Sequence, residues 1–93
     1  MKMLAVYDIA ETKRLNRVAK ILKDYGVRVQ YSKFEIDPVR SSAFTVLQER
    51  INEVIDPEVD GVKFIPLCRR CLATIEIIGC GTYVDPDAEY YIL

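Results

Sequence analysis

The chain has 93 residues, of which 51% are hydrophobic and 29% are charged, with a formal net charge of −1 at pH 7. This length predicts a single domain over residues 1–93 that buries roughly 60–65% of its unfolded surface, and such limited burial favours a dimer. The absence of histidine excludes Ser/His and Cys/His nucleophile pairs, and without a signal-peptide pattern or a run of ~20 apolar residues we expect a cytoplasmic protein.

The first predicted element is a strand over residues 3–8. Its apolar run is continuous, so we expect it to be buried on both faces. A helix follows from Thr12 to Tyr25, with Thr12 as its N-cap and Gly26 as a left-handed C-cap. Its buried stripe is predicted from helical spacing and consists of Leu15, Val18, Leu22 and Tyr25.

Residues 27–36 are rich in β-branched and aromatic side chains, but polar residues interrupt the segment. A single strand and two short strands around a bend are both compatible with it. A second helix is expected to begin with Ser41 or Ser42 as its cap and to end at Asp56-Pro57. Its apolar face is predicted to contain Phe44, Leu47, Ile51, Val54 and Ile55.

Two further strands are expected over residues 62–67 and 72–78, and the second alternates in the way typical of a sheet with one covered face. The apolar segment 88–93 should pack on its own sheet edge or on that of a partner. The order of elements predicts an α+β fold, namely a ferredoxin-like β-α-β-β-α-β sandwich with an additional C-terminal β-strand, as a homodimer.

Asp8 is the first candidate functional residue, because it follows the apolar run at the end of the first strand. It either caps the next turn or acts as a metal ligand. One carboxylate cannot hold Mg²⁺ tightly, since this ion prefers an octahedral set of oxygen ligands. A two-fold dimer with its axis near the end of this strand would bring two copies of Asp8 to one shared Mg²⁺ site.

Positive charge is concentrated in the first part of the chain. Residues 1–40 contain nine Lys/Arg and five Asp/Glu, whereas residues 41–93 contain four and nine. A row of basic side chains is either a solvated face or a phosphate-binding surface. Arginine matches phosphate in a bidentate manner, so Arg14, Arg17 and Arg28 are the candidate nucleic-acid contacts.

The sequence contains a Cys-x-x-Cys pair at Cys68 and Cys71, and a third cysteine, Cys80. We expect the pair in a turn between two strands instead of at a strand-to-helix junction. Reduced structural thiols are favoured, while a local disulfide and a shared metal site remain alternatives.

Four segments, taken in order, resemble a known family. They are YDI at residues 7–9, KRLNRVAKIL from Lys13, YGVRVQYSKFE at residues 25–35, and FIPLC at residues 64–68. Together they resemble the second core family of CRISPR-associated proteins, here called the Cas-two family, over nearly the whole chain.

The resemblance implies a homodimer with Asp8 at the interface as the Mg²⁺ ligand, and an endonuclease or endoribonuclease activity on RNA or DNA. It also implies a role in spacer acquisition, in which the dimer binds duplex DNA together with dimers of the Cas-one integrase. By motif position, the residues that match supporting or nucleic-acid-binding positions are Tyr7, Arg17, Arg28, Ser32 and Phe34.

Position 15, which is basic in some members, is Leu15 here, with Arg14 beside it. Within the resemblance, this departure weakens the expectation of strong nuclease activity more than the expectation of nucleic-acid binding. Three alternatives therefore stay open: a non-catalytic scaffold, a toxin-like RNA interferase of related fold, and a regulatory domain that binds a metabolite between its subunits.

Overall fold

A computed structural model of the chain describes residues 2–38 and 40–79. Within these ranges no helix is long and apolar enough to cross a membrane. The elements are β1 (Lys2–Asp8), α1 (Thr12–Lys23), β2 (Gly26–Gln30), β3 (Lys33–Ile36), α2 (Ser41–Asn52), β4 (Gly61–Leu67) and α3 (Arg69–Ala73).

The four strands form one sheet in the order β2-β3-β1-β4, and every neighbouring pair is antiparallel. The predicted α+β class and the β-α-β-β-α-β order are confirmed. Residues 27–36 belong to a hairpin of two short strands, and the polar interruption falls in the turn between them at Tyr31 and Ser32. A register shift lies between Arg28 and Gln30 of β2. Strand β1 is central, so both of its neighbours fix its end in space.

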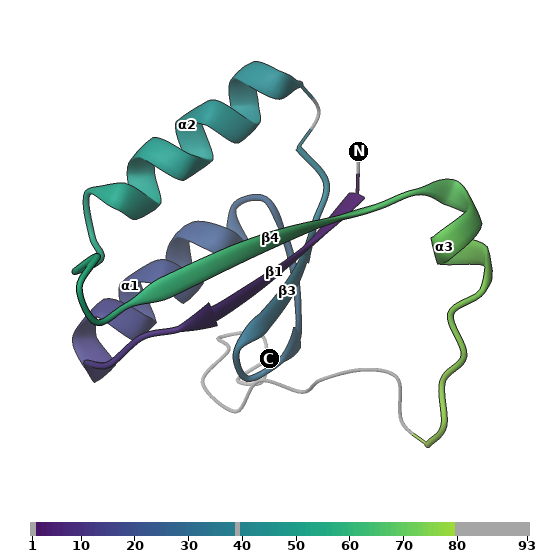
Figure 1. The fold of residues 1–93 in the computed structure, drawn as a ribbon, viewed down its shortest axis with the longest axis horizontal. Helices are drawn as coiled ribbons and strands as arrows, with labels where there is room; N and C mark the ends of the chain where they lie inside the picture. Colours follow the sequence, from purple (N-terminus) through teal and green to yellow (C-terminus); the bar gives the residue numbers. More distant parts are fainter. Residues whose placement is uncertain (1, 39, 80–93) are drawn as a thin grey trace, which may run out of the picture.

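The two long helices lie next to each other on one face of the sheet (Figure 1). Each contributes the apolar stripe expected from its sequence, with Val18 and Leu22 from α1 and Leu47 and Ile51 from α2 buried. From the sheet, Phe34 and Ile36 are completely buried against them. Helix α2 ends at Asn52, before the predicted stop, and the turns after it pack further apolar side chains on the core.

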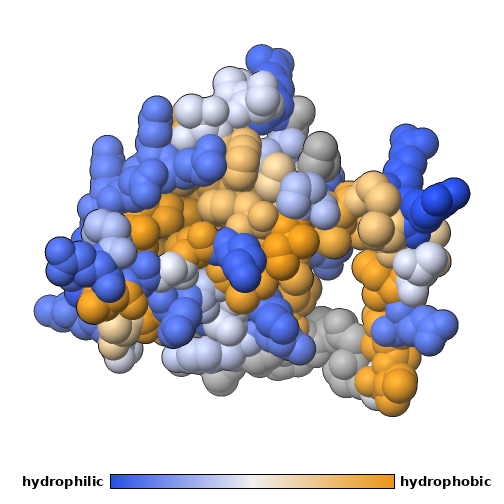
Figure 2. All heavy atoms as spheres, in the orientation of Figure 1, coloured by the Kyte–Doolittle hydropathy of each residue, from blue (hydrophilic) through white to orange (hydrophobic). Residues whose placement is uncertain are grey.

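The opposite face of the sheet is open, which corrects the prediction that β1 is buried on both sides. Ala5 and Tyr7 face the helices and are buried, whereas Leu4 and Val6 alternate with them and are only half-buried. Ile65, the cross-strand neighbour of Leu4, is exposed. Figure 2 shows apolar atoms over the middle of the molecule, where Figure 1 places β1 and β4.

The predicted caps are wrong in detail. The N-caps are Glu11 and Arg40, and neither makes a side-chain capping hydrogen bond. The chain enters each helix one residue earlier than the capping pattern indicates, so Thr12 and Ser41 are the first helical residues. Helix α1 ends at an ordinary right-handed C-cap, Asp24. Gly26, predicted to be a left-handed C-cap, is instead the first residue of β2.

The strand predicted over residues 72–78 is also wrong. Helix α3 begins directly after β4, so the two cysteines lie at a strand-to-helix junction, contrary to expectation. The segment after α3 runs away from the sheet without pairing (Figure 1). Its alternating side chains Ile75 and Ile77 are exposed, because no sheet edge in the described part of the chain receives them. The strand expected over residues 88–93 lies outside the described residues.

Gly26 is required for close packing between β2 and β3. A Cβ atom at this position would overlap the carbonyl oxygen of Glu35 and lie 2.7 Å from the Cα atom of Ile36. These are backbone atoms, which cannot move without shifting the strand pair.

We therefore expect Gly26→Ala to lower the free energy of unfolding by about 1–3 kcal/mol, the usual cost of inserting atoms into a packed site. Urea denaturation of the purified protein measures this change. Gly61→Ala is the matched control, because a Cβ there meets nothing within 4 Å. Equal effects of the two substitutions would contradict the packing argument.

Candidate metal and nucleic-acid site at the end of strand β1

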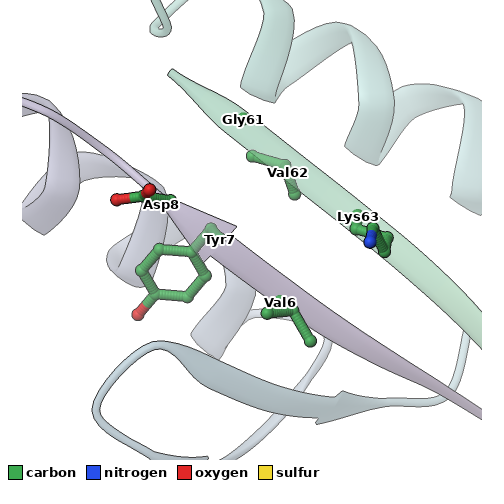
Figure 3. A pocket seen from close by; sticks show the side chains of 6 residues that line it. All are labelled: Val6, Tyr7, Asp8, Gly61, Val62 and Lys63. Carbon is green, nitrogen blue, oxygen red and sulfur yellow. The ribbon is translucent and has the colours of Figure 1, made fainter. Parts of the chain in front are cut away.

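Asp8 is the last residue of β1, and its register partner in β4 is Gly61. Its side chain is exposed beside an open hollow of about 330 Å³ on the sheet (Figure 3). The hollow is lined by Val6, Tyr7, Asp8, Gly61, Val62 and Lys63. Because side chains alternate along a strand, Asp8 belongs to the same face as Val6, which is the open face of the sheet.

Among residues 2–38 and 40–79, the Asp8 carboxylate takes part in no hydrogen bond or ion pair. The alternative that Asp8 caps the turn after β1 therefore has no support in the described structure. Asp60 serves that turn instead, because its Oδ1 accepts a hydrogen bond of 2.9 Å from the backbone N–H of Ala10.

Tyr7 connects the end of β1 to the β2–β3 turn by hydrogen bonds. Its backbone N–H donates to the carbonyl of Ser32 at 3.1 Å, and its hydroxyl donates to the carbonyl of Tyr31 at 3.0 Å. Its ring is buried, with its centroid 6.1 Å from that of Phe34. The residue next to Asp8 is thus held by hydrogen bonds to the hairpin turn and by the core.

Arg28 completes this group from β2. Its guanidinium donates from Nε and Nη2 to the Tyr31 carbonyl at 3.1 and 2.6 Å, and from Nη2 to the Tyr7 hydroxyl at 3.3 Å. It also lies 5.1 Å above the Tyr31 ring and 5.6 Å from the Phe34 ring centroid, in the range of cation–π contacts. The structure therefore brings together four predicted residues, Tyr7, Arg28, Ser32 and Phe34.

Asp60, which sequence reasoning missed, joins the start of β4 to the start of α1. Besides Ala10, its carboxylate accepts from the Asp56 backbone N–H at 2.8 Å, from Arg14 Nε at 2.7 Å and from Arg14 Nη2 at 3.3 Å. The bond from Arg14 is the main cause that holds the pKa of Asp60 well below its usual range. The available signal was an acid directly before Gly61 and the strand, a pattern shared by many ordinary turns.

Arg14 is consequently occupied within the chain. Two of its nitrogens bind Asp60, and its third, Nη1, lies 3.4 Å from a carboxylate oxygen of Glu11. Its donors are thus directed toward carboxylates, which favours a structural role over a phosphate contact. Arg17, by contrast, is exposed on α1 together with Lys13 and Lys20.

The described residues of one chain offer few ligands for a metal ion at this site. Within the described residues, no group of three Asp, Glu, Cys or His side chains is arranged to hold a metal ion. Lys63, a second residue that sequence reasoning missed, lines the hollow and is the register partner of Val6. Its position follows from strand alternation, but only once the pairing of β1 with β4 is known.

These features define a small α+β domain with an exposed carboxylate at a strand end and a basic helix next to it. Residues 1–75 match the model of a family described as CRISPR associated protein Cas2. The chain belongs to this Cas2 family of CRISPR-associated proteins, which is the Cas-two family that its motifs resemble.

Individual relatives match most or all of the chain. The chain is 37% identical over 94 residues to CRISPR-associated endoribonuclease Cas2 1 of Chloroflexus aurantiacus, with 100% of both chains covered. It is 38% identical over 86 residues to CRISPR-associated endoribonuclease Cas2 3 of Synechocystis sp., with 92% of each covered. The crystal structure of Streptococcus pyogenes Cas2 at pH 6.5 is similar with a TM-score of 0.76 and 34% identity, over 85% of this chain and 100% of that one.

Asp60 should make the stability of the fold depend on pH in the acidic range. Because its pKa is lowered in the folded state, it stabilises the fold fully above the pKa of an unfolded aspartate, about 3.9, and this contribution is lost as the pH falls below that value. We expect Asp60→Asn to lower the thermal unfolding midpoint at pH 7 by several degrees, and the difference from wild type to shrink between pH 4 and pH 2.

Circular dichroism melts across this pH range measure the effect. The matched control is Asp56→Asn, because Asp56 is exposed and its side chain only accepts from the Glu58 backbone N–H, at 3.1 Å. A difference between wild type and Asp60→Asn that stays constant down to pH 2 would contradict the role given to the carboxylate charge.

Proposed function

We propose that this chain acts in CRISPR spacer acquisition as a homodimer that binds duplex nucleic acid together with the Cas-one integrase, and that it is a Mg²⁺-dependent endoribonuclease or endonuclease. The observation that carries the proposal is the placement of Asp8: exposed, free of hydrogen bonds among the described residues, and on the open face of the sheet. The names of the relatives, CRISPR-associated endoribonucleases, support the choice of reaction.

The open face supports a homodimer. Leu4 and Val6 of β1 and Ile65 of β4 leave apolar surface in contact with water, and Ile75 and Ile77 add more beyond α3. A second copy of this face would cover such surface, and a two-fold axis near the end of β1 would bring the two Asp8 side chains together.

The residues present fit Mg²⁺ only as a shared site. Among the described residues, one chain offers Asp8 alone at this site, whereas two carboxylates provide the charge that such a site needs and would repel each other without a cation. Mg²⁺ bound there would supply positive charge to a phosphate and polarise water. The contribution of the chain itself is orientation, because Tyr7 and Arg28 on one side and Asp60 on the other hold the strand end that carries Asp8.

Phosphate binding is assigned first to Arg17, with Lys13 and Lys20 on the same exposed face of α1. Arg28 is half-buried and already donates to Tyr31 and Tyr7. It would therefore either contact nucleic acid with one edge of its guanidinium or attract phosphate by its positive charge without direct contact. Arg14 ranks below both because Asp60 and Glu11 occupy its donors.

A second candidate function is a scaffold that positions duplex DNA while the integrase breaks and forms bonds. Two features favour it: the described residues place one carboxylate per chain at this site, and Leu15 stands where the family resemblance implies a basic residue in some members. The two functions differ in what they require of Asp8, and one experiment separates them.

We expect Asp8→Asn to reduce Mg²⁺-dependent cleavage of RNA or duplex DNA by about 100-fold or more, because the ligand charge for the ion is removed. Duplex binding and sedimentation as a dimer should stay nearly unchanged. Gel-based cleavage over a Mg²⁺ titration measures the first, and analytical ultracentrifugation the second.

Asp24→Asn is the matched control, since it removes one exposed aspartate charge at the end of α1. Cleavage by Asp8→Asn at the wild-type rate would exclude the catalytic role. Absence of cleavage in the wild type, with duplex binding intact, would select the scaffold function.

For the basic face, we expect Arg17→Ala to weaken duplex binding and to reduce the slope of log K against log salt by about 0.9, as expected for one lost phosphate contact. Fluorescence anisotropy from 50 to 300 mM salt measures the slope. Arg50→Ala is the control, because Arg50 is paired with Asp24 at 2.9 Å. A slope unchanged by Arg17→Ala would remove this residue from the interface.

A further inference from the structure

Cys68 and Cys71 are not explained by the proposed function. Cys68 is the N-cap of α3, directly after the last residue of β4, and Cys71 lies within the first turn of that helix. Both are free thiols and both are exposed to solvent. Within the described residues of one chain, neither thiol is packed in the core.

The two sulfur atoms face each other. Their Sγ atoms lie 3.2 Å apart, and the backbone N–H of Cys71 donates to Cys68 Sγ at 3.4 Å. A disulfide has an S–S length of about 2.05 Å, so closing this bond needs an approach of about 1.2 Å, within the reach of side-chain rotation. The backbone turn at the β4–α3 junction has already brought the two residues together.

The two thiols are not equivalent. The backbone N–H of Cys71, followed by the Cys71 thiol, stabilises the thiolate of Cys68 and lowers the pKa of that residue. The same contact raises the pKa of Cys71, because its thiol donates to Cys68 and its own thiolate would lie beside another negative charge. Cys68 is thus the sulfur that ionises first.

A metal site explains this arrangement less well. Two thiolates are only half of the four ligands of a structural zinc site. Within the described residues no third Asp, Glu, Cys or His joins them in a suitable group. The geometry favours chemistry between the two sulfur atoms.

We propose that Cys68 and Cys71 form a redox-active dithiol that exchanges with small disulfides such as oxidised glutathione, with Cys68 as the attacking residue. The Cys68 thiolate attacks one sulfur of the disulfide, forms a mixed disulfide and releases one glutathione thiolate. Cys71 then loses its proton to solvent and attacks Cys68 Sγ, which closes the protein disulfide and releases the second glutathione. Two protein thiols are oxidised while one glutathione disulfide is reduced to two thiols.

The product would join the N-cap of α3 covalently to its first turn. The exposed segment with Ile75 and Ile77 extends from this helix. Oxidation would therefore restrict the conformation of α3, the helix from which this segment extends. This inference does not depend on the proposed nuclease or scaffold function.

The test uses the full chain with Cys80→Ser, so that only Cys68 and Cys71 carry thiols and both remain wild type. The protein is equilibrated at pH 7 with glutathione buffers of increasing oxidised fraction, quenched with acid, alkylated with N-ethylmaleimide and weighed intact. We expect the species with two alkyl groups to be replaced by an unalkylated species that is lighter than the reduced protein by the mass of two hydrogen atoms. Its absence in the most oxidising buffer would overturn the proposal.

The order of attack is tested with two further variants in the Cys80→Ser background. Cys71→Ser leaves Cys68 with the same backbone donor and a hydroxyl in place of the thiol, and Cys68→Ser leaves Cys71 alone. At pH 6 we expect the mixed disulfide with glutathione to form several-fold faster at Cys68 than at Cys71, because more of Cys68 is ionised. Equal rates, or a faster Cys71, would overturn the assignment of Cys68 as the attacking residue.

Discussion

The buried carboxylate of Asp60 is the interaction on which the end of β1 depends. It accepts hydrogen bonds from Ala10 after β1 and from Arg14 of α1, and from Asp56 in the turn before β4, and so joins two segments that are far apart in the sequence. A buried carboxylate without such donors would destabilise the fold, so the two segments and the charge stabilise one another. The connection between β1 and α1 therefore has a fixed course, and Asp8 precedes it at a fixed place.

The hairpin supplies the second constraint. Tyr7 and Arg28 share the Tyr31 carbonyl as acceptor. The Tyr7 ring and the Arg28 guanidinium both contact Phe34, which lies in the core. The candidate functional residues thus fall into two groups, according to whether their side chains form hydrogen bonds within the described part of the chain. Some are occupied in holding the fold, as Arg14 and Arg28 are, while others such as Asp8 and Arg17 face solvent. Substitutions in the first class should change stability and binding together, whereas those in the second should change binding or cleavage with little effect on stability.

Sequence reasoning worked where the information is local. Helical spacing in α1 and α2, the apolar residues of β1 and β4, and the position of Asp8 after an apolar run were readable from neighbouring residues. It failed where the partner is distant. The bond between Arg14 and Asp60 spans 46 positions, and nothing near either residue marks the pairing. Residues 72–78 alternate as a strand does, but alternation cannot show whether a sheet edge is available to receive them.

A segment patterned for a sheet, exposed at Ile75 and Ile77, lies beyond α3 in a chain whose sheet also leaves one face partly apolar. Both surfaces are incomplete in one copy for the same reason, since neither meets another layer within the described residues. A second copy would cover both, and it would also bring a second Asp8 carboxylate to the site. The proposed assembly and the proposed metal site therefore depend on the same symmetry.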